Sequence, residues 1–218
     1  MTVIGITGPT GAGKTTALEV LAEMDFEIVD CDALYYRLLR TDETLRQGLR
    51  DAFGEVFLPD GNLDRRTLAK RVFGDERELA KLNAVVFPAM SAAVEQKIQK
   101  CSQKGLAIDA INLVESGMGK LCGATVAVTA APAVRLQRIM DRDGLTEEQA
   151  RARIEAQKPV DWYRENCSFL LENREEDRAA FEALTRSFFL NLLNTMNKGE
   201  TCNGREERDT SDGEKERL

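Results

Sequence analysis

Gly8-Pro9-Thr10-Gly11-Ala12-Gly13-Lys14-Thr15 is the stretch that decides the fold of this 218-residue chain. The spacing Gly-x-x-x-x-Gly-Lys-Thr lets successive backbone N–H groups curl round a polyphosphate, because glycine has no Cβ to block the curl. We expect Lys14 to reach the β- and γ-phosphates of a nucleotide and the hydroxyl of Thr15 to ligate Mg²⁺.

The segments on either side are those that a phosphate-binding loop requires. Residues 3–7 form a β-branched run typical of a buried parallel strand, and residues 16–24 have apolar side chains at helical spacing. The helix N-terminus then directs its partial positive charge at the phosphates. The alternative is a tight glycine-rich turn without a ligand. The predicted nucleotide-binding residues of this loop are Gly8, Gly11, Ala12, Gly13, Lys14, Thr15 and Thr16.

Composition excludes several classes of protein. Histidine is absent, which excludes Ser-His-Asp, Cys-His and His-ligated metal chemistry. Five scattered cysteines without a Cys-x-x-Cys pair argue against a disulfide framework and a zinc site. A net charge of −7 disfavours a nucleic-acid partner. No apolar run approaches the ~20 residues that span a bilayer, and a first strand at residue 3 leaves no room for a signal peptide. We therefore expect a soluble, cytoplasmic protein.

We expect one α/β domain over residues 1–196, a three-layer P-loop kinase fold with a five-stranded parallel sheet, and then a disordered polar tail over residues 197–218. The predicted strands are 3–7, 26–30, 106–111, 125–129 and 168–173. The closing helix is predicted over residues 176–194, with Phe181, Leu184, Phe188 and Leu192 facing the sheet.

Residues 33–101 show helical patterns and no convincing strand, which predicts a helical insertion after the second strand. The predicted helices are 33–40, 43–53, 65–72 and 76–101, and Pro88 should kink or break the last of them. Small kinases of this architecture bind the phosphoryl acceptor on such an insertion. The alternative is a purely structural helical layer.

Aspartates follow two of the predicted strands. Asp30 and Asp32 come at the end of the second strand, on the edge of the sheet where ligands bind in open α/β folds. Asp32 is suited to orient an attacking hydroxyl and accept its proton, or to join the Mg²⁺ shell through water. The alternative is that Asp32 caps the helix that starts at Ala33. Asp109, in the third strand, is a candidate second-sphere partner of Mg²⁺ or a contact to the acceptor.

Arginines dominate the segment after the fourth strand. Arg135, Arg138 and Arg142 share one helix face, directed at the edge where the phosphates lie. Gly144 ends this helix, and Thr146 opens a second helix with a capping box. Residues 138–160 therefore predict a lid that closes over the nucleotide and excludes water. The alternative is a solvated, charged helix pair.

Taken together, these segments resemble the dephospho-CoA kinases. The resemblance is carried by residues 4–16, 29–33, 60–68 with 72–73, 115–117, 138–145 and 153–157. It implies ATP-dependent phosphorylation of the ribose 3′-hydroxyl of dephospho-CoA, the last step of coenzyme A synthesis, by a monomer or weak homo-oligomer. By position, Asp32 matches the presumed base, Lys14 the loop lysine and Arg142 the lid arginine. The resemblance also implies a nucleotide contact from Arg138 and acceptor contacts from Asp32, Leu63, Asp64, Arg65, Asp109 and Glu115.

The chain departs from the family pattern at three positions. Phe87 stands where histidine usually precedes the proline, Asn112 replaces a usual proline, and Val114 replaces a common aromatic residue. Another small-molecule kinase, similar to shikimate or nucleotide kinases, is the nearest alternative. A signalling GTPase is less consistent, since its Asn-Lys-x-Asp motif appears only as residues 197–200, with glutamate last. A catalytically inactive scaffold is disfavoured because Lys14, Thr15, Asp32 and Arg142 are all present.

Overall fold

A computed structural model describes residues 1–174 and 177–198 of the chain. The tail predicted over residues 197–218 therefore lies outside the described residues from residue 199 onward. Asn197, its first predicted residue, is the last residue of the closing helix.

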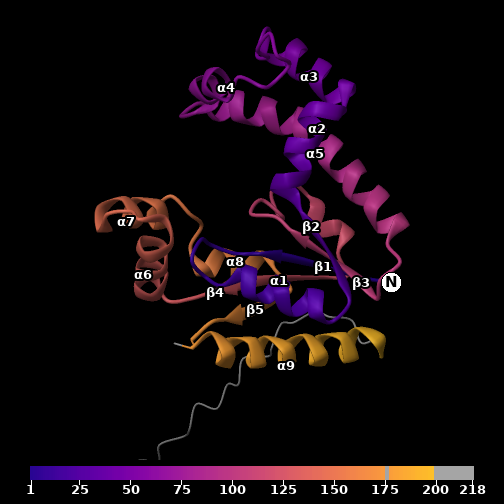
Figure 1. Ribbon diagram of the computed structural model, residues 1–218, viewed down its shortest axis with the longest axis vertical. Coiled ribbons are helices and arrows are strands. Elements are labelled where there is room, and N and C mark those ends of the chain that lie inside the picture. Colours follow the sequence, from indigo (N-terminus) through magenta and orange to yellow (C-terminus); the bar gives the residue numbers. More distant parts are fainter. Residues whose placement is uncertain (175–176, 199–218) are drawn as a thin grey trace, which may run out of the picture.

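The described strands form one five-stranded, fully parallel sheet, as the sequence predicts, in the order β2-β3-β1-β4-β5 (Figure 1). Because β1 is central, the loop that follows it lies in the middle of the carboxyl edge, with β3 on one side and β4 on the other. This is the place where open α/β sheets bind ligands. The strands are β1 Thr2–Thr7, β2 Phe26–Asp30, β3 Gly105–Asp109, β4 Ala124–Thr129 and β5 Phe169–Glu172.

Helix starts follow the aspartates of the sequence. The side chains of Asp30, Asp42, Asp64, Asp75 and Asp177 each accept a backbone N–H in the first turn of the helix that follows. The short α8 and the 3₁₀ helix Met118–Leu121 were not predicted, because each is too short for a periodic pattern. The helices are α1 Lys14–Glu23, α2 Cys31–Thr41, α3 Glu43–Phe53, α4 Arg65–Val72, α5 Glu76–Lys100, α6 Pro132–Asp143, α7 Glu147–Glu155, α8 Val160–Asn166 and α9 Arg178–Asn197.

Helices cover both faces of the sheet. On one face, α1 and α9 pack against β1 and β4, and on the other the second half of α5 packs against β3. The prediction that Leu184 faces the sheet is wrong, since it is 41% exposed. The buried stripe of α9 runs through Phe181, Thr185, Phe189 and Leu192. Because Thr185 is polar, the apolar pattern of the sequence alone does not indicate which face of the helix is buried.

Helices α2 to α5 stand beyond one face of the sheet and have a core of their own, which includes Leu49, Phe53 and Leu68 (Figure 1). The first half of α5 belongs to this core and its second half to the core under the sheet. Of the kink or break predicted at Pro88, the break does not occur, since α5 runs through this exposed proline. Packing on both sides of Pro88 outweighs the one lost hydrogen bond.

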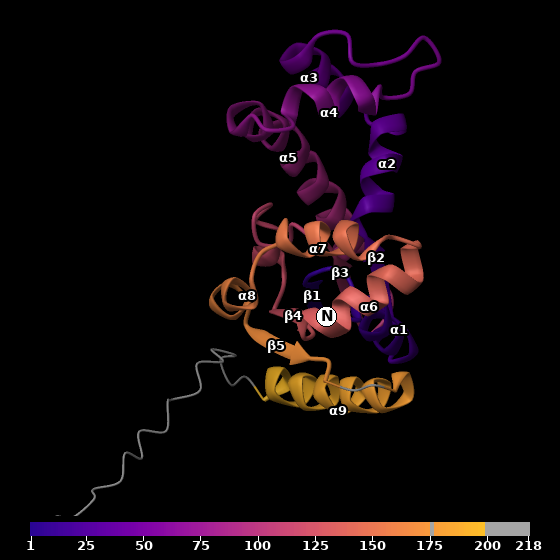
Figure 2. The ribbon, with the colours of Figure 1, turned by 90° about the vertical axis from the view of Figure 1, so that its left-hand side faces the viewer.

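Helices α6 and α7 lie together at the carboxyl edge of the sheet (Figure 2). Gly144 ends α6 in the left-handed conformation, and Thr146 forms the predicted capping box with Gln149. Within residues 1–174 and 177–198, no helix combines the length and apolar character that crossing a bilayer requires.

Candidate active site

The loop between β1 and α1 has a backbone that only glycine accepts at its two ends. Gly8 has φ +130°, and a Cβ there would lie 2.1 Å from the carbonyl oxygen of Val128 in β4. Gly13 has φ +109°, and its Cβ would lie 2.7 Å from Nδ2 of Asn173. The close approach of β4 and β5 to the loop therefore requires these glycines.

Two side chains, one from the loop itself and one from the residue after β5, bind carbonyl groups of the loop. Lys14 Nζ donates to the carbonyls of Gly8 (2.7 Å) and Pro9 (3.2 Å), and Asn173 Nδ2 donates to that of Ala12 (3.1 Å). Gly13 is the N-cap residue of helix α1, and no side chain of the described residues caps this helix end. Fixed carbonyls and an uncapped helix N-terminus suit the binding of an anion.

The loop opens into a pocket of about 680 Å³ at the carboxyl edge of the sheet. The strand order explains its composition, because aspartates from β2, α2 and β3 reach it from one side of the loop and residues of α6 from the other. Gly8, Ala12 and Thr16 belong to the loop but do not line the pocket. The lining residues are Thr10, Gly11, Gly13, Lys14, Thr15, Asp30, Asp32, Asp109, Ile111, Arg138, Asp141 and Arg142.

The three aspartates of the pocket have different surroundings. Asp30 caps α2, since its Oδ1 accepts the N–H of Ala33 at 2.9 Å. Asp32 is exposed and lies inside the first turn of α2, after the N-cap position that Asp30 occupies, so the predicted alternative of a capping Asp32 is wrong. Asp109 is the register partner of Asp30 in the neighbouring strand. Burial raises the pKa of Asp109 to about 6, with Lys14 opposing the rise and Asp30 and Asp32 adding to it.

The pKa of Lys14 responds to both the acids and the arginines of the site. Burial lowers its pKa, Asp109 raises it, and the positive charges of Arg135 and Arg142 lower it further. The described site therefore concentrates positive charge on one side of Lys14 and negative charge on the other. A bound anion would relieve the repulsion among the cations.

The arginines of α6 do not act as the one cationic face that the sequence predicts. Arg135 is 4% exposed and does not line the pocket. It supports the loop, since its Nε donates to the carbonyl of Thr10 at 2.9 Å and its NH2 donates to Gln157 Oε1 at 2.5 Å. Gln157 in turn accepts the N–H of Thr10 (3.1 Å) and donates to its hydroxyl (2.8 Å). Both ends of the α6–α7 pair are thus bound to Thr10.

The two other arginines remain in the pocket. Arg138 NH1 donates to the carbonyl of Gly11 at 3.4 Å. Arg142 pairs with Asp143 through Nε (2.7 Å) and NH2 (2.9 Å), and Arg153 of α7 pairs with the same carboxylate. These two pairs lower the pKa of Asp143 to about 2, Arg142 contributing most. In this conformation the guanidinium of Arg142 is oriented by Asp143.

A second pocket of about 320 Å³, here called the distal pocket, lies on the helical insertion. Two of the predicted acceptor contacts, Leu63 and Arg65, line it, whereas Asp64 caps α4 by accepting from the N–H and hydroxyl of Thr67. The structure does not bring Glu115 to either pocket. The residues that line the distal pocket are Tyr36, Leu39, Arg40, Asn62, Leu63 and Arg65.

Sequence reasoning missed the supporting role of three residues. Gln157 belongs to a segment that carries the family resemblance, and Arg135 belongs to the predicted cationic helix face. Asn173 was predicted only as the end of a strand. Asn173 is a polar residue directly after a strand that ends at the ligand-binding edge of the sheet. This position is a signal in the sequence from which its role at the loop could have been predicted.

Comparison with known proteins gives the family. The family model for dephospho-CoA kinase matches residues 2–178. The dephospho-CoA kinase of Dehalococcoides mccartyi is 37% identical over 161 residues, which cover 72% of this chain and 81% of that protein. The enzyme of the same name from Anaeromyxobacter dehalogenans is 36% identical over 177 residues, 79% of this chain and 84% of that protein. The crystal structure of TT1252 from Thermus thermophilus superposes with a TM-score of 0.71 at 32% identity, covering 88% of this chain and 97% of that one.

These matches favour neither the GTPase nor another small-molecule kinase, and they agree with the P-loop kinase fold and the pocket described above. The chain therefore belongs to the dephospho-CoA kinase family, the enzymes that phosphorylate dephospho-CoA with ATP in the synthesis of coenzyme A.

Proposed function

We propose that the pocket at the loop transfers the γ-phosphoryl group of ATP to the ribose 3′-hydroxyl of dephospho-CoA, with Lys14, Asp32 and Arg142 as its catalytic residues. The observation that carries this assignment is the position of the loop between carboxylates on one side and the arginines of α6 on the other. Phosphoryl transfer depends on positioning and on charge stabilisation, and this arrangement supplies both.

The donor half of the reaction is assigned to the loop. The backbone of Gly11, Gly13 and their neighbours cradles the phosphates of ATP, with Gly8 and Ala12 holding the loop against β4 and β5, and Thr16 in the first turn of α1. Lys14 neutralises charge that grows between the β- and γ-phosphates. For Lys14 Nζ to do so, it has to turn from the carbonyls of Gly8 and Pro9 toward the phosphates, which its flexible stem allows.

Mg²⁺ suits the residues of this pocket. The hydroxyl of Thr15 and the carboxylates of Asp32 and Asp109 are hard oxygen donors in one cavity, and Mg²⁺ prefers such ligands together with water and phosphate. We assign direct ligation to Thr15 and water-mediated contacts to Asp109. When bound, Mg²⁺ neutralises phosphate charge.

The acceptor half is assigned to Asp32 and the helical insertion over residues 33–101. Asp32 is exposed in the pocket and is free of the capping role that Asp30 performs, so its carboxylate is available to a hydroxyl. Leu63 and Arg65 contact the acceptor in the distal pocket, which lies farther along α2 than Asp32. Asp64 caps the start of α4 beside them. An acceptor contact from Glu115 has no support in the geometry of either pocket.

The lid, over residues 138–160, is assigned the task of closing over ATP and excluding water, with Arg138 contacting the nucleotide. Gln157 near its end and Arg135 just before its start both bind Thr10, which connects closure to the loop. We further propose that the protein acts in the cytoplasm as a monomer or weak homo-oligomer. We also propose that it has no nucleic-acid partner, which its net charge of −7 supports.

Arg142→Ala is expected to lower turnover more than ATP affinity, because the lid arginine meets the phosphates only after closure. Binding of ATP to the ligand-free enzyme and kcat at saturation are the two measurements. The matched control is Arg151→Ala, since Arg151 is a lid arginine with the same side-chain exposure (60% against 59%) and a glutamate partner. Loss of ATP affinity with normal kcat would reduce Arg142 to a binding residue.

The overall proposal is tested by mixing the purified chain with Mg·ATP and dephospho-CoA and following ADP together with the product. We expect stoichiometric ADP and 3′-phosphorylated product, much less with shikimate or an isolated nucleoside as acceptor, and none when a chelator removes Mg²⁺. Equal turnover with shikimate, or full activity in the chelator, would contradict the acceptor or the metal assignment respectively.

A further inference from the structure

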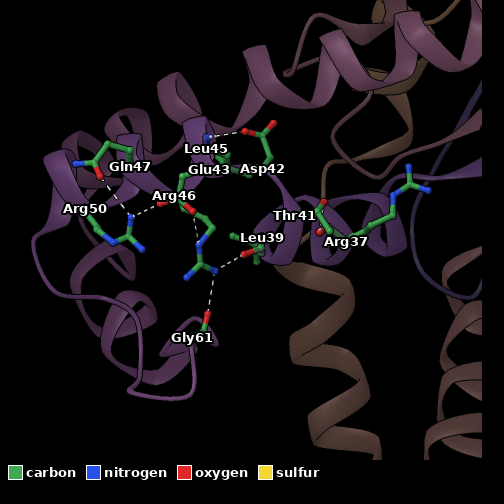
Figure 3. Close-up of polar contacts among 10 residues, drawn as sticks. All are labelled: Arg37, Leu39, Thr41, Asp42, Glu43, Leu45, Arg46, Gln47, Arg50 and Gly61. Carbon is green, nitrogen blue, oxygen red and sulfur yellow. Dashed lines mark hydrogen bonds and ion pairs between the residues drawn. The ribbon is translucent and has the colours of Figure 1, made fainter.

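Arg46 of α3 joins the two walls of the distal pocket (Figure 3). Its NH1 donates to the carbonyl of Leu39, in the last turn of α2, at 2.7 Å and to that of Gly61 at 2.9 Å. The side chain is 13% exposed, is stacked 4.3 Å from the ring centroid of Phe57, and its Nε faces Glu43 at 3.3 Å. One guanidinium therefore sets the spacing between α2 and the segment that carries Gly61.

That segment is an ordered hairpin and forms the second wall. Phe57 pairs with Leu63 in an antiparallel bridge, and the N–H of Leu58 donates to the carbonyl of Asn62 at 2.8 Å. Gly61 lies at its turn with φ +82°, and Asn62 and Leu63 directly after it line the pocket. A bond to the Gly61 carbonyl thus positions the pocket-lining residues beside it.

The distal pocket carries the charge that a diphosphate requires. Arg40 and Arg65 both line it, and the guanidinium of Arg65 lies 4.0 Å from the ring centroid of Tyr36. A guanidinium stacked on a ring keeps its N–H edges available for phosphate oxygens. Two arginines in one pocket are suited to bind an anion.

The distal pocket also lies farther along α2 than Asp32, the residue to which the reacting ribose of the acceptor is assigned. Asp32, Tyr36 and Arg40 follow one another at i, i+4 and i+8, on one exposed face of α2. At 1.5 Å per residue, Tyr36 and Arg40 are about 6 Å and about 12 Å beyond Asp32 along the helix. An elongated acceptor with its ribose at Asp32 can place its diphosphate beside these residues.

We infer that Arg40 and Arg65 bind the diphosphate of the acceptor in the distal pocket, and that Arg46 is the positioning residue that holds this pocket in shape. The inference rests on the proposed function of the first pocket. It assigns Arg46 an effect on acceptor binding although Arg46 does not line the distal pocket.

Arg46→Met tests this inference, because methionine keeps an apolar stem over Phe57 and removes both hydrogen bonds. Arg50→Met is a matched control, since Arg50 lies one turn away, over the same ring at 5.1 Å, and pairs with the same Glu43. We expect Arg46→Met to raise KM for dephospho-CoA at least tenfold, with KM for ATP and kcat changed less than twofold. All three constants of Arg50→Met should stay within twofold of wild type.

An Arg46→Met enzyme whose KM for dephospho-CoA stays within twofold, or whose two KM values rise equally, would overturn the inference. If this variant does not fold, the double variant Arg40→Met with Arg65→Met, at two exposed positions, replaces it. The same rise in KM for dephospho-CoA alone supports the diphosphate site, and an unchanged KM overturns it. Wild-type enzyme that does not phosphorylate dephospho-CoA would instead refute the proposed function.

Discussion

Lys14→Ala is expected to lower kcat by roughly 10²-fold or more, a few kcal/mol of barrier, because the charge that develops between the β- and γ-phosphates loses its cation. The fold should survive. Lys14 is half-buried at the surface end of α1, and its two hydrogen bonds go to carbonyls of the loop itself. Steady-state turnover with both substrates saturating is the measurement.

The control for this prediction is Lys104→Ala. Lys104 is exposed just before β3, at the amino edge of the sheet and away from the pocket. Its replacement changes the net charge by the same amount and should leave turnover within about twofold. A Lys14→Ala enzyme that keeps over half of the wild-type turnover would refute the assignment of the phosphate-binding loop.

Asp32→Asn is expected to slow phosphoryl transfer to dephospho-CoA by roughly 10²–10⁴-fold while ATP binding stays nearly unchanged. Asparagine keeps the shape and one hydrogen-bonding oxygen but removes the charge that receives the proton. A carboxylate is a weak base for a ribose hydroxyl, so its contribution comes late, once the loose transition state has made that hydroxyl acidic. Single-turnover transfer with both substrates saturating measures this step directly, and slow hydrolysis of ATP by water should survive.

Asp30→Asn is the informative comparison for Asp32. Its amide oxygen can still cap α2, so the helix is retained and transfer should fall far less than in Asp32→Asn. A single-turnover rate for Asp32→Asn within about threefold of wild type, well under 1 kcal/mol of barrier, would show that the proton acceptor lies elsewhere. Asp109 would then be the next candidate, because it lines the same pocket and burial raises its pKa.

Local sequence was sufficient for the parts of the fold that depend on short-range patterns. β2 and the helices Glu43–Phe53 and Arg65–Val72 begin and end where the sequence predicts them, because capping aspartates and apolar periodicity act within a few residues. The phosphate-binding loop was equally readable, since its glycine spacing is a local requirement of backbone conformation. Leu184 was misplaced because Thr185 and Phe189, and not Leu184, complete the buried stripe of α9.

Long-range packing decided the rest. The sequence was sufficient to nominate the residues to which we assign the chemistry: a loop lysine, aspartates at the ends of two strands, and arginines after a third. Only the tertiary structure decided that Arg135 supports the loop through Thr10 and that Arg46 joins two walls of a second pocket. The physical reason is that strand order and buried polar contacts join residues far apart in the chain, and no local pattern of side chains encodes which of several similar arginines will be buried.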